Sequence, residues 1–172
     1  MHIVDSIDFK EIEIMRPEGN MIIDQTTLRN LELTHTLSGE KEGSLLGAID
    51  KCRTSMGRRM LKQWILRPLA KKHSIEERQD AVATIARSSR RLDELRDCLK
   101  GLRDMERLAT QLSYNRSAGR DLVAIGLALE RMPRLKSLCL EVDDPLLTRI
   151  SEELDALDMM KIDIQANLKD EQ

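Results

Sequence analysis

Apolar residues recur at spacings of three and four over most of the sequence, and this spacing restricts the fold more than any other feature. The plainest series reads Leu92, Leu95, Leu99 and Leu102. Because an α-helix completes a turn every 3.6 residues, side chains at these spacings share one face. Only three of the 172 residues are aromatic, so the core is expected to be aliphatic, which favours helices. We therefore predict a mainly all-α, multi-helical fold.

The first part of the chain departs from this periodicity. Residues 10–23 alternate charged and apolar side chains on either side of a Pro-Glu-Gly-Asn turn, which predicts a short extended hairpin. Three short helices are then expected over 25–33, 45–51 and 55–66. Their starts carry polar side chains that accept bonds from the free N–H groups of a first turn. These expected N-caps are Asp24, Ser44, and either Thr54 or Ser55.

The third of these helices carries an apolar stripe that includes the single tryptophan. Met56, Met60 and Trp64 lie four residues apart, and this spacing favours a core position over a ligand-binding role. Gly57 interrupts the helix at a cost of about 1 kcal/mol relative to Ala. We interpret it as a point where another helix or a loop approaches closely. The segment 28–69 is therefore predicted to be a packing hub with its Leu, Met and Trp side chains in the core.

A capping box predicts the start of the next helix. Ser74 and Glu77 have the spacing at which each side chain bonds the backbone N–H of the other, and the helix is expected to reach Arg87. Arg78 falls on its apolar side. Its long stem is suited to covering apolar surface while the charge stays in water, with a neighbouring carboxylate as the alternative partner.

The last apolar series predicts one long amphipathic helix over 145–167. Its members are Leu147, Ile150, Leu154, Leu157, Met160, Ile164 and Leu168. This seam suits pairing with another helix of the chain or with one outside it, and the sequence leaves both open. Before it we expect two short helices over 92–102 and 105–112, and a helix capped by Ser117 and interrupted at Met132–Pro133.

Length, cysteines and the N-terminus favour a single intracellular domain. A chain of 172 residues is long enough to bury a core without covalent staples. Cys52, Cys98 and Cys139 lie far apart without a CxxC or Cys/His cluster, which argues against disulfides and a zinc site. The first residues are acidic where a secretion signal needs a basic start, and no apolar run approaches the length of a membrane span.

Charge is distributed unevenly although the net charge is only -2. Residues 51–73 contain eight lysines and arginines and no acid, whereas the sequence after Leu140 is strongly acidic. We interpret both as solvated helix faces, with contacts to DNA phosphates as the second interpretation. The candidate DNA-backbone contacts are Lys51, Arg53, Lys62, Arg67, Lys71 and Lys72.

No pattern in the sequence indicates an active site. The Gly39–Ser44 segment has three residues between its glycines and lacks the lysine that a Walker A phosphate loop needs. The three histidines are scattered, and the carboxylates lie on polar helix faces where solvation is the usual role. We therefore expect no catalysis and no cofactor or metal site.

Several short motifs nevertheless occur in a characteristic order. They are Leu28-Arg29-Asn30-Leu31-Glu32-Leu33, Ser44-Leu45-Leu46-Gly47 with Asp50, Met56-Gly57-Arg58-Arg59, Leu61, Trp64, Pro68-Leu69, Ile75, Arg78 and Asp80-Ala81-Val82. Over residues 20–82 the chain resembles the core, or lever, domain of the MutS family of DNA mismatch-repair proteins. Looser motifs at Leu99-Lys100-Gly101, Asp104, Glu106-Arg107, Arg116 and Asp121-Leu122 are similar to the continuation of that domain.

The resemblance implies a non-catalytic piece of a larger protein. Residues 1–23 would be the end of the connector segment, and 24–172 the first portion of the core that joins a DNA clamp to an ATPase. The larger protein would use ATP and Mg²⁺, and its partners would be mismatched duplex DNA, a second subunit and downstream repair proteins. It would be cytoplasmic and nucleoid-associated in a prokaryote, or nuclear in a eukaryote.

Within this interpretation, the 145–167 helix is part of the lever and the 28–69 segment is its fulcrum. Seven residues are candidates for interdomain or internal contacts, namely Arg29, Asn30, Glu32, Gly57, Arg58, Arg59 and Trp64. Two alternatives remain open: an independent helical module that binds the DNA backbone, and a helical adaptor that uses its acidic helix as a partner surface.

Overall fold

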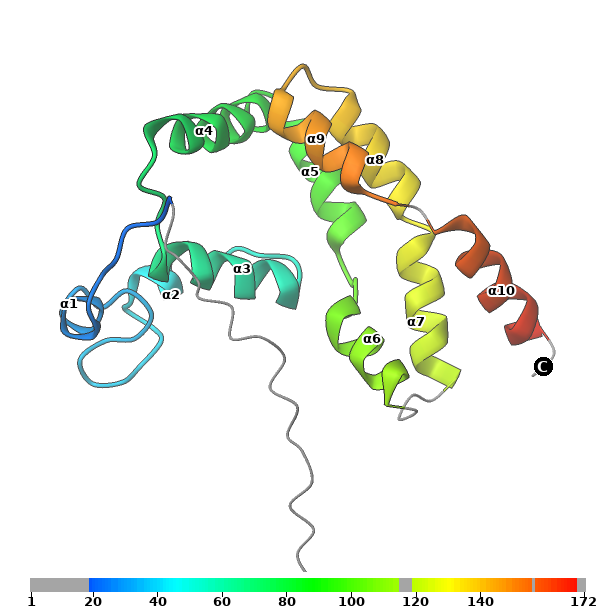
Figure 1. The fold of residues 1–172 in the computed structure, drawn as a ribbon, viewed down its shortest axis with the longest axis horizontal. Coiled ribbons are helices and arrows are strands. Elements are labelled where there is room, and N and C mark those ends of the chain that lie inside the picture. Colours follow the sequence, from blue (N-terminus) through cyan, green and yellow to red (C-terminus); the bar gives the residue numbers. More distant parts are fainter. Residues whose placement is uncertain (1–18, 115–118, 156, 170–172) are drawn as a thin grey trace, which may run out of the picture.

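The computed structural model describes residues 19–114, 119–155 and 157–169, and the regular secondary structure in these ranges is α-helical (Figure 1). This confirms the predicted fold class. The helices are α1 Gln25–Asn30, α2 Leu45–Ile49, α3 Ser55–Leu66, α4 Lys72–Ala86, α5 Ser89–Leu99, α6 Met105–Ser113, α7 Gly119–Leu129, α8 Met132–Leu140, α9 Pro145–Glu153 and α10 Asp158–Lys169. None of them has the length and apolar character needed to cross a membrane.

The three predicted N-caps at the start of the chain are confirmed. In each case the cap side chain accepts the backbone N–H three residues later, at 2.9 Å for Asp24, 3.1 Å for Ser44 and 3.0 Å for Thr54. Helix α1 ends at Asn30, earlier than predicted, because Glu32 adopts a left-handed φ of 48°. The Glu32 carboxylate then accepts the N–H of Leu37 at 2.6 Å and closes the following loop.

A short backbone pairing ties the beginning of the described chain to the segment between α3 and α4. Asn20 and Leu69 form an antiparallel bridge, in which Met21 N–H donates to Pro68 O at 2.7 Å. Ala70 N–H donates to Gly19 O at 2.8 Å. Residues 10–18 of the predicted hairpin lie outside the described residues. The described pairing partner of Asn20 is Leu69.

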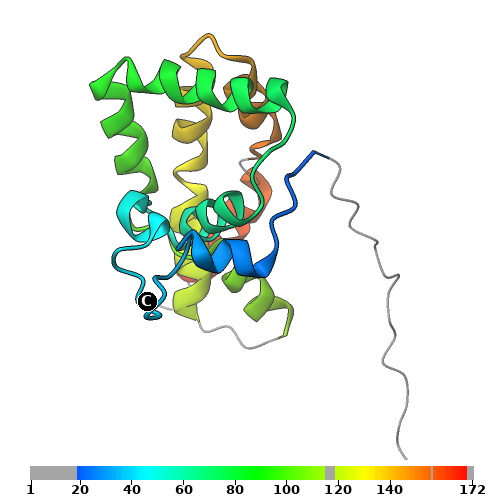
Figure 2. The same ribbon diagram turned by 90° about the vertical axis from the view of Figure 1, so that its left-hand side faces the viewer.

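Helices α4–α10 form one stack: α5 and α6 descend in succession, α7 and α8 ascend beside them, α9 and α10 descend again, and α4 crosses the top (Figures 1 and 2). Helix α9 packs along α8 and touches α4, α10 packs along α7, and α5 lies against α8. Two clusters of buried side chains fill this stack. One contains Ala81, Cys139, Val142 and Leu147, and the other contains Leu108, Ile125, Leu129 and Ile164.

The single long helix predicted over 145–167 is wrong, because the chain breaks between α9 and α10. Leu154 ends α9, Leu157 has a φ of 47°, and the N–H of Leu157 donates to the Asp155 carboxylate at 2.9 Å. The break follows from packing. Helices α7 and α8 are themselves separated at residues 130–131, so two separate helices are needed for α9 to follow α8 and α10 to follow α7. The apolar spacing continues across this break, so the spacing alone could not reveal it.

The predicted capping box at Ser74 is also not formed. Helix α4 begins at Lys72, three residues before the start that a Ser74 cap predicts, and its N-cap Lys71 makes no side-chain capping bond. The chain enters the helix directly from the paired segment, since Ala70 is held by Gly19 and Ile75 N–H already bonds Lys71 O at 3.2 Å. The Glu77 carboxylate instead forms a salt bridge with Arg149 of α9 at 2.9 Å. The N-cap predicted at Ser117 lies outside the described residues.

Candidate functional site

Of the residues predicted for interdomain contacts, Arg59 connects α3 to α6. Helix α3 belongs to the N-terminal part, residues 19–67, and α6 belongs to the α4–α10 stack. The side chain of Arg59 reaches from α3 to Asp104, the N-cap of α6, with Nη2 at 2.9 Å from Oδ1. It also contacts Glu106 in the first turn of α6. Ser55 adds a hydrogen bond from its hydroxyl to Asp104 at 3.3 Å.

Asp104 is the centre of this ion cluster, which consists of Ser55, Arg59, Asp104 and Glu106. Its side chain is 14% exposed, and it also accepts the N–H of Arg107 as the helix cap. The hydrogen bonds from Arg59 lower the pKa of Asp104 to about 2, against an ordinary value of 3.8. The same bonds raise the pKa of Arg59, so the charged pair persists across the physiological range.

The neighbouring Arg58 forms a different kind of pair. Its Nε lies 2.8 Å from Oδ2 of Asp50, which also receives Lys41 at 2.9 Å. All three residues belong to the N-terminal part. Two adjacent arginines of one motif therefore have distinct roles: Arg58 stabilises its own part of the fold, and Arg59 connects it to the helical stack.

Acid should weaken the Arg59 connection. The folded pKa of Asp104 lies below its ordinary value, so the carboxylate contributes its full stability above pH 3.8 and loses it as the pH falls towards about 2. Asp104→Asn keeps the shape and removes the titration. We expect urea unfolding between about pH 5 and pH 2 to be less pH-dependent in this variant. Asp143→Asn, an equivalent change at an exposed site, is the control and should retain the wild-type dependence.

The apolar stripe of α3 does not lie in a core, contrary to the prediction. No residue of α3 is buried, and Met60 and Trp64 are 54% and 43% exposed. Periodicity identifies an apolar face but does not show what covers it. The guanidinium of Arg78 instead lies over the Trp64 ring, 3.8 Å from the ring centroid. This cation–π contact joins α3 to α4. It explains why Arg78 lies on the apolar side of α4.

Gly57 marks no approach of a second helix. A Cβ placed there would meet the hydroxyl oxygen of the N-cap Thr54 at 3.0 Å and, at 3.9 Å, Cβ of Cys52 in the segment that leads into the same helix. The tight glycine is Gly47 of α2, where a Cβ would lie 2.3 Å from the carbonyl oxygen of Lys41. The sequence contained a signal for this position, because Gly47 is part of the Ser44–Gly47 motif.

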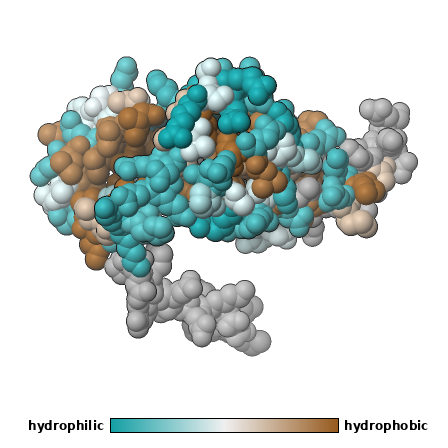
Figure 3. All heavy atoms as spheres, turned by 90° about the horizontal axis from the view of Figure 1, so that it is seen from above, coloured by the Kyte–Doolittle hydropathy of each residue, from teal (hydrophilic) through white to brown (hydrophobic). Residues whose placement is uncertain are grey.

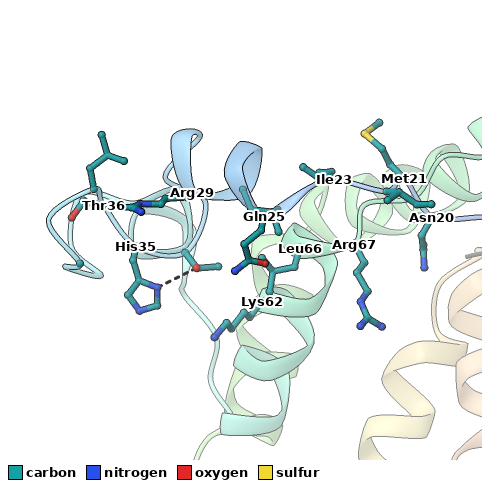
Figure 4. Close-up of a pocket in the computed structure, with 15 residues that line it drawn as sticks. Asn20, Met21, Ile23, Gln25, Arg29, His35, Thr36, Lys62, Leu66 and Arg67 are labelled. Carbon is teal, nitrogen blue, oxygen red and sulfur yellow. Dashed lines mark hydrogen bonds between the residues drawn. The ribbon is translucent and has the colours of Figure 1, made fainter. Parts of the chain in front are cut away.

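The remaining candidates are spread over the N-terminal part and its linker. Arg29, Lys62 and Arg67 line a hollow of about 1020 Å³ beside α1 and α3 (Figure 4). Lys72 pairs with Glu76 at 3.4 Å. Lys51, Arg53, Lys71 and Asn30 are exposed, and Lys51 and Arg53 lie between α2 and α3. Of the six cations predicted to contact DNA, Lys62 and Arg67 line the hollow and the other four do not.

Sequence reasoning missed Asp104 and Glu106 as partners of Arg59. They lie 45 and 47 residues away, and no periodic pattern connects residues so far apart. The resemblance had included both residues as motif positions without giving them a role. Among the residues that the structure describes, no group of His, Cys, Asp and Glu has a metal-binding arrangement.

The family model and the relatives that match this chain all point to the same family. The family described as MutS domain III matches residues 26–171. The DNA mismatch repair protein MutS of Exiguobacterium sp. is 40% identical over 154 residues, covering 89% of this chain and 18% of the relative. That of Bacillus licheniformis is 40% identical over 147 residues, covering 85% and 17%.

A third relative, the DNA mismatch repair protein MutS of Caldicellulosiruptor saccharolyticus, is 37% identical over 150 residues, covering 87% of this chain and 17% of its own. The chain thus spans less than a fifth of the length of these curated relatives. The family match extends over both the N-terminal part and the helical stack that Arg59 joins. The chain belongs to the MutS domain III family.

Proposed function

We propose that this chain is the non-catalytic core segment of a longer DNA mismatch-repair protein, in which it links a DNA clamp to an ATPase domain. Residues 1–23 would end the preceding connector, and 24–172 would form the first portion of the core. ATP and Mg²⁺ would be bound by other parts of the longer protein. Its partners would be mismatched duplex DNA, a second subunit and downstream repair proteins.

The observation that carries this proposal is the Arg59 bridge. The N-terminal part contributes a single buried apolar side chain, Leu46, whereas the helical stack contains both core clusters. The two parts are joined by the ion cluster at Asp104, the Arg78–Trp64 contact and the linker before α4. A few side-chain contacts between the N-terminal part and the packed stack allow small rigid-body shifts to pass from one to the other.

The α4–α10 stack is suited to carry such a shift. Its helices are fixed to each other by buried side chains, so a displacement at α6 is expected to move α7 and α10 together. Packed interiors are dense and resist compression. In this proposal the rigid body is the packed stack, rather than one long helix.

The proposal predicts that Arg59→Gln in the full-length protein weakens the dependence of ATP turnover on DNA. Variants along a coupling network change the coupling free energy by about 0.5–2 kcal/mol, equivalent to about two- to thirtyfold. We expect a loss of DNA-stimulated ATPase activity in this range, while DNA-independent turnover stays near the wild-type rate. The measurement is steady-state ATP hydrolysis with and without a mismatched duplex.

Arg58→Gln is the matched control, since it removes the adjacent arginine and an ion pair inside the N-terminal part. It should leave the DNA stimulation unchanged. If a folded Arg59→Gln protein kept full stimulation, or if both variants lost it equally, the coupling role of the bridge would be wrong.

A further inference from the structure

We propose that the hollow beside α1 and α3 is a docking site for an acidic amphipathic helix that belongs to another segment of the longer mismatch-repair protein. This inference rests on the proposed function, because it requires the chain to be part of a longer polypeptide. The proposed function is tested by the Arg59→Gln variant and the docking site by peptide binding, so one can be wrong without the other. The argument uses the shape of the hollow, its lining and its charge.

The hollow is built from three separate pieces of the N-terminal part (Figure 4). Entry residues 20–23 and α1 form one wall, the loop after Leu33 forms a second, and the last turns of α3 form a third. Its volume of about 1020 Å³ is large enough for several side chains of a partner helix. Helix-in-groove complexes use such hollows for anchors at i, i+3, i+4 and i+7.

Aliphatic side chains make up much of the lining and are open to solvent. Met21, Ile22 and Leu37 are 53%, 78% and 60% exposed, and Leu28 and Leu66 lie deeper. Figure 3 shows hydrophobic atoms gathered at the end of the molecule that carries α1 and the following loop. Exposed apolar side chains gathered around one hollow are typical of a protein–protein contact.

The charge of the hollow restricts the partner. Its lining includes Arg29, Lys62 and Arg67 and no acidic residue. Neither Arg29 nor Lys62 has a carboxylate partner among the residues that the structure describes. A partner helix with acids beside its apolar stripe would bury the aliphatic side chains and pair with these cations. Complementary charge would fix its orientation.

Nucleic acid fits this hollow less well. The lining contains no tryptophan, tyrosine or phenylalanine on which a base would stack, and its one imidazole, that of His35, is hydrogen-bonded to the Thr34 hydroxyl at 3.1 Å. A duplex held by Arg29 and Lys62 through its phosphates would leave Met21, Ile22 and Leu37 in water. The observations therefore favour a protein segment.

The length of the relatives indicates where that segment comes from. The matched region is 17–18% of the relatives' sequences, so more than four-fifths of such a polypeptide lies outside it. A segment of the same polypeptide has a high effective concentration at the hollow and needs only modest intrinsic affinity.

Peptides test this proposal directly. Overlapping peptides of about 20 residues would be made from the full-length protein outside residues 1–172. Each would be titrated against the 172-residue chain by fluorescence anisotropy. We expect binding by a peptide that is net acidic and has an apolar helical stripe, and no binding by basic peptides.

Two variants locate the binding on the chain. Lys62→Glu and Ile22→Asp should each weaken binding by at least about tenfold. Lys51→Glu is the matched control, because Lys51 is an exposed lysine of the same acid-free run that does not line the hollow. It should bind as wild type. Circular dichroism of each variant verifies that the helices are retained.

Several results would overturn the inference. These are the absence of any binding peptide, equal binding by basic peptides, and binding that the Lys51→Glu variant loses as much as the Lys62→Glu variant. Binding of a short DNA duplex that Lys62→Glu abolishes would make the hollow a nucleic-acid site. Concentration-dependent self-association lost in Ile22→Asp would make it an interface between copies. A failed peptide experiment with a positive Arg59→Gln result would leave the proposed function standing.

Discussion

Leu129→Ala is expected to lower the free energy of unfolding by about 2–5 kcal/mol, the range for truncating a fully buried leucine. Leu129 lies near the end of α7 and is 3% exposed. It packs with Leu108 of α6, Ile125 of α7 and Ile164 of α10. Removing its side chain leaves a cavity where three helices meet. Urea denaturation followed by circular dichroism measures the loss.

Leu127→Ala is a control on the same helix. Leu127 is 55% exposed and points away from the core, so its truncation should change the free energy of unfolding by no more than about 0.5 kcal/mol. Both variants lose the same atoms and gain the same helix propensity. Equal effects at the two positions would mean that α7 does not pack against α6 and α10 as described.

Gly47→Ala is the second change with a large expected effect, a loss of about 1–3 kcal/mol. The new methyl group would lie 2.3 Å from the carbonyl oxygen of Lys41, well inside van der Waals contact. That oxygen is fixed, because it accepts bonds from the N–H and the hydroxyl of Ser44 at 3.2 and 2.6 Å. The loop or helix α2 must therefore move, and the Ser44 cap is strained or lost.

Gly57→Ala is its natural comparison, since Gly57 has the same place three residues after the N-cap of α3. Its nearest obstacle is the Thr54 hydroxyl at 3.0 Å, a side-chain atom rather than a backbone carbonyl, so the clash is milder than at Gly47. The gain in helix propensity of about 1 kcal/mol opposes this small clash. We expect Gly57→Ala to remain within about 1 kcal/mol of wild type. Thermal unfolding of both variants compares them, and a larger loss at Gly57 would contradict the contact geometry.

Local signals predicted the helices well because their causes lie within a few residues. Asp24, Ser44 and Thr54 cap the helices they precede. The short helices α5 and α6 occur with Gly101, at φ 76°, between them, as the apolar spacing had indicated. A cap or a turn is determined by neighbouring residues, and a sequence records neighbours directly.

The predictions that were wrong depended on how segments distant in the sequence pack against each other. The stripe of Met60 and Trp64 has the spacing of a core face, yet exposure depends on which helices pack against α3. The break at Leu154–Leu157 depends on the break between α7 and α8. For the candidate site, Arg58 and Arg59 were identified by resemblance. Their different partners follow only from the placement of Asp50 and Asp104.

The pairing of Asn20 with Leu69 has a mechanical consequence. It brings the two ends of the N-terminal part to one point, so that α1, α2 and α3 form a closed loop attached at its base. A pull on the chain before Gly19 would pass through the bonds to Pro68 and Ala70 directly into the start of α4. The loop is thereby shielded from tension along the chain, and its position relative to the stack is left to the side-chain contacts of α3.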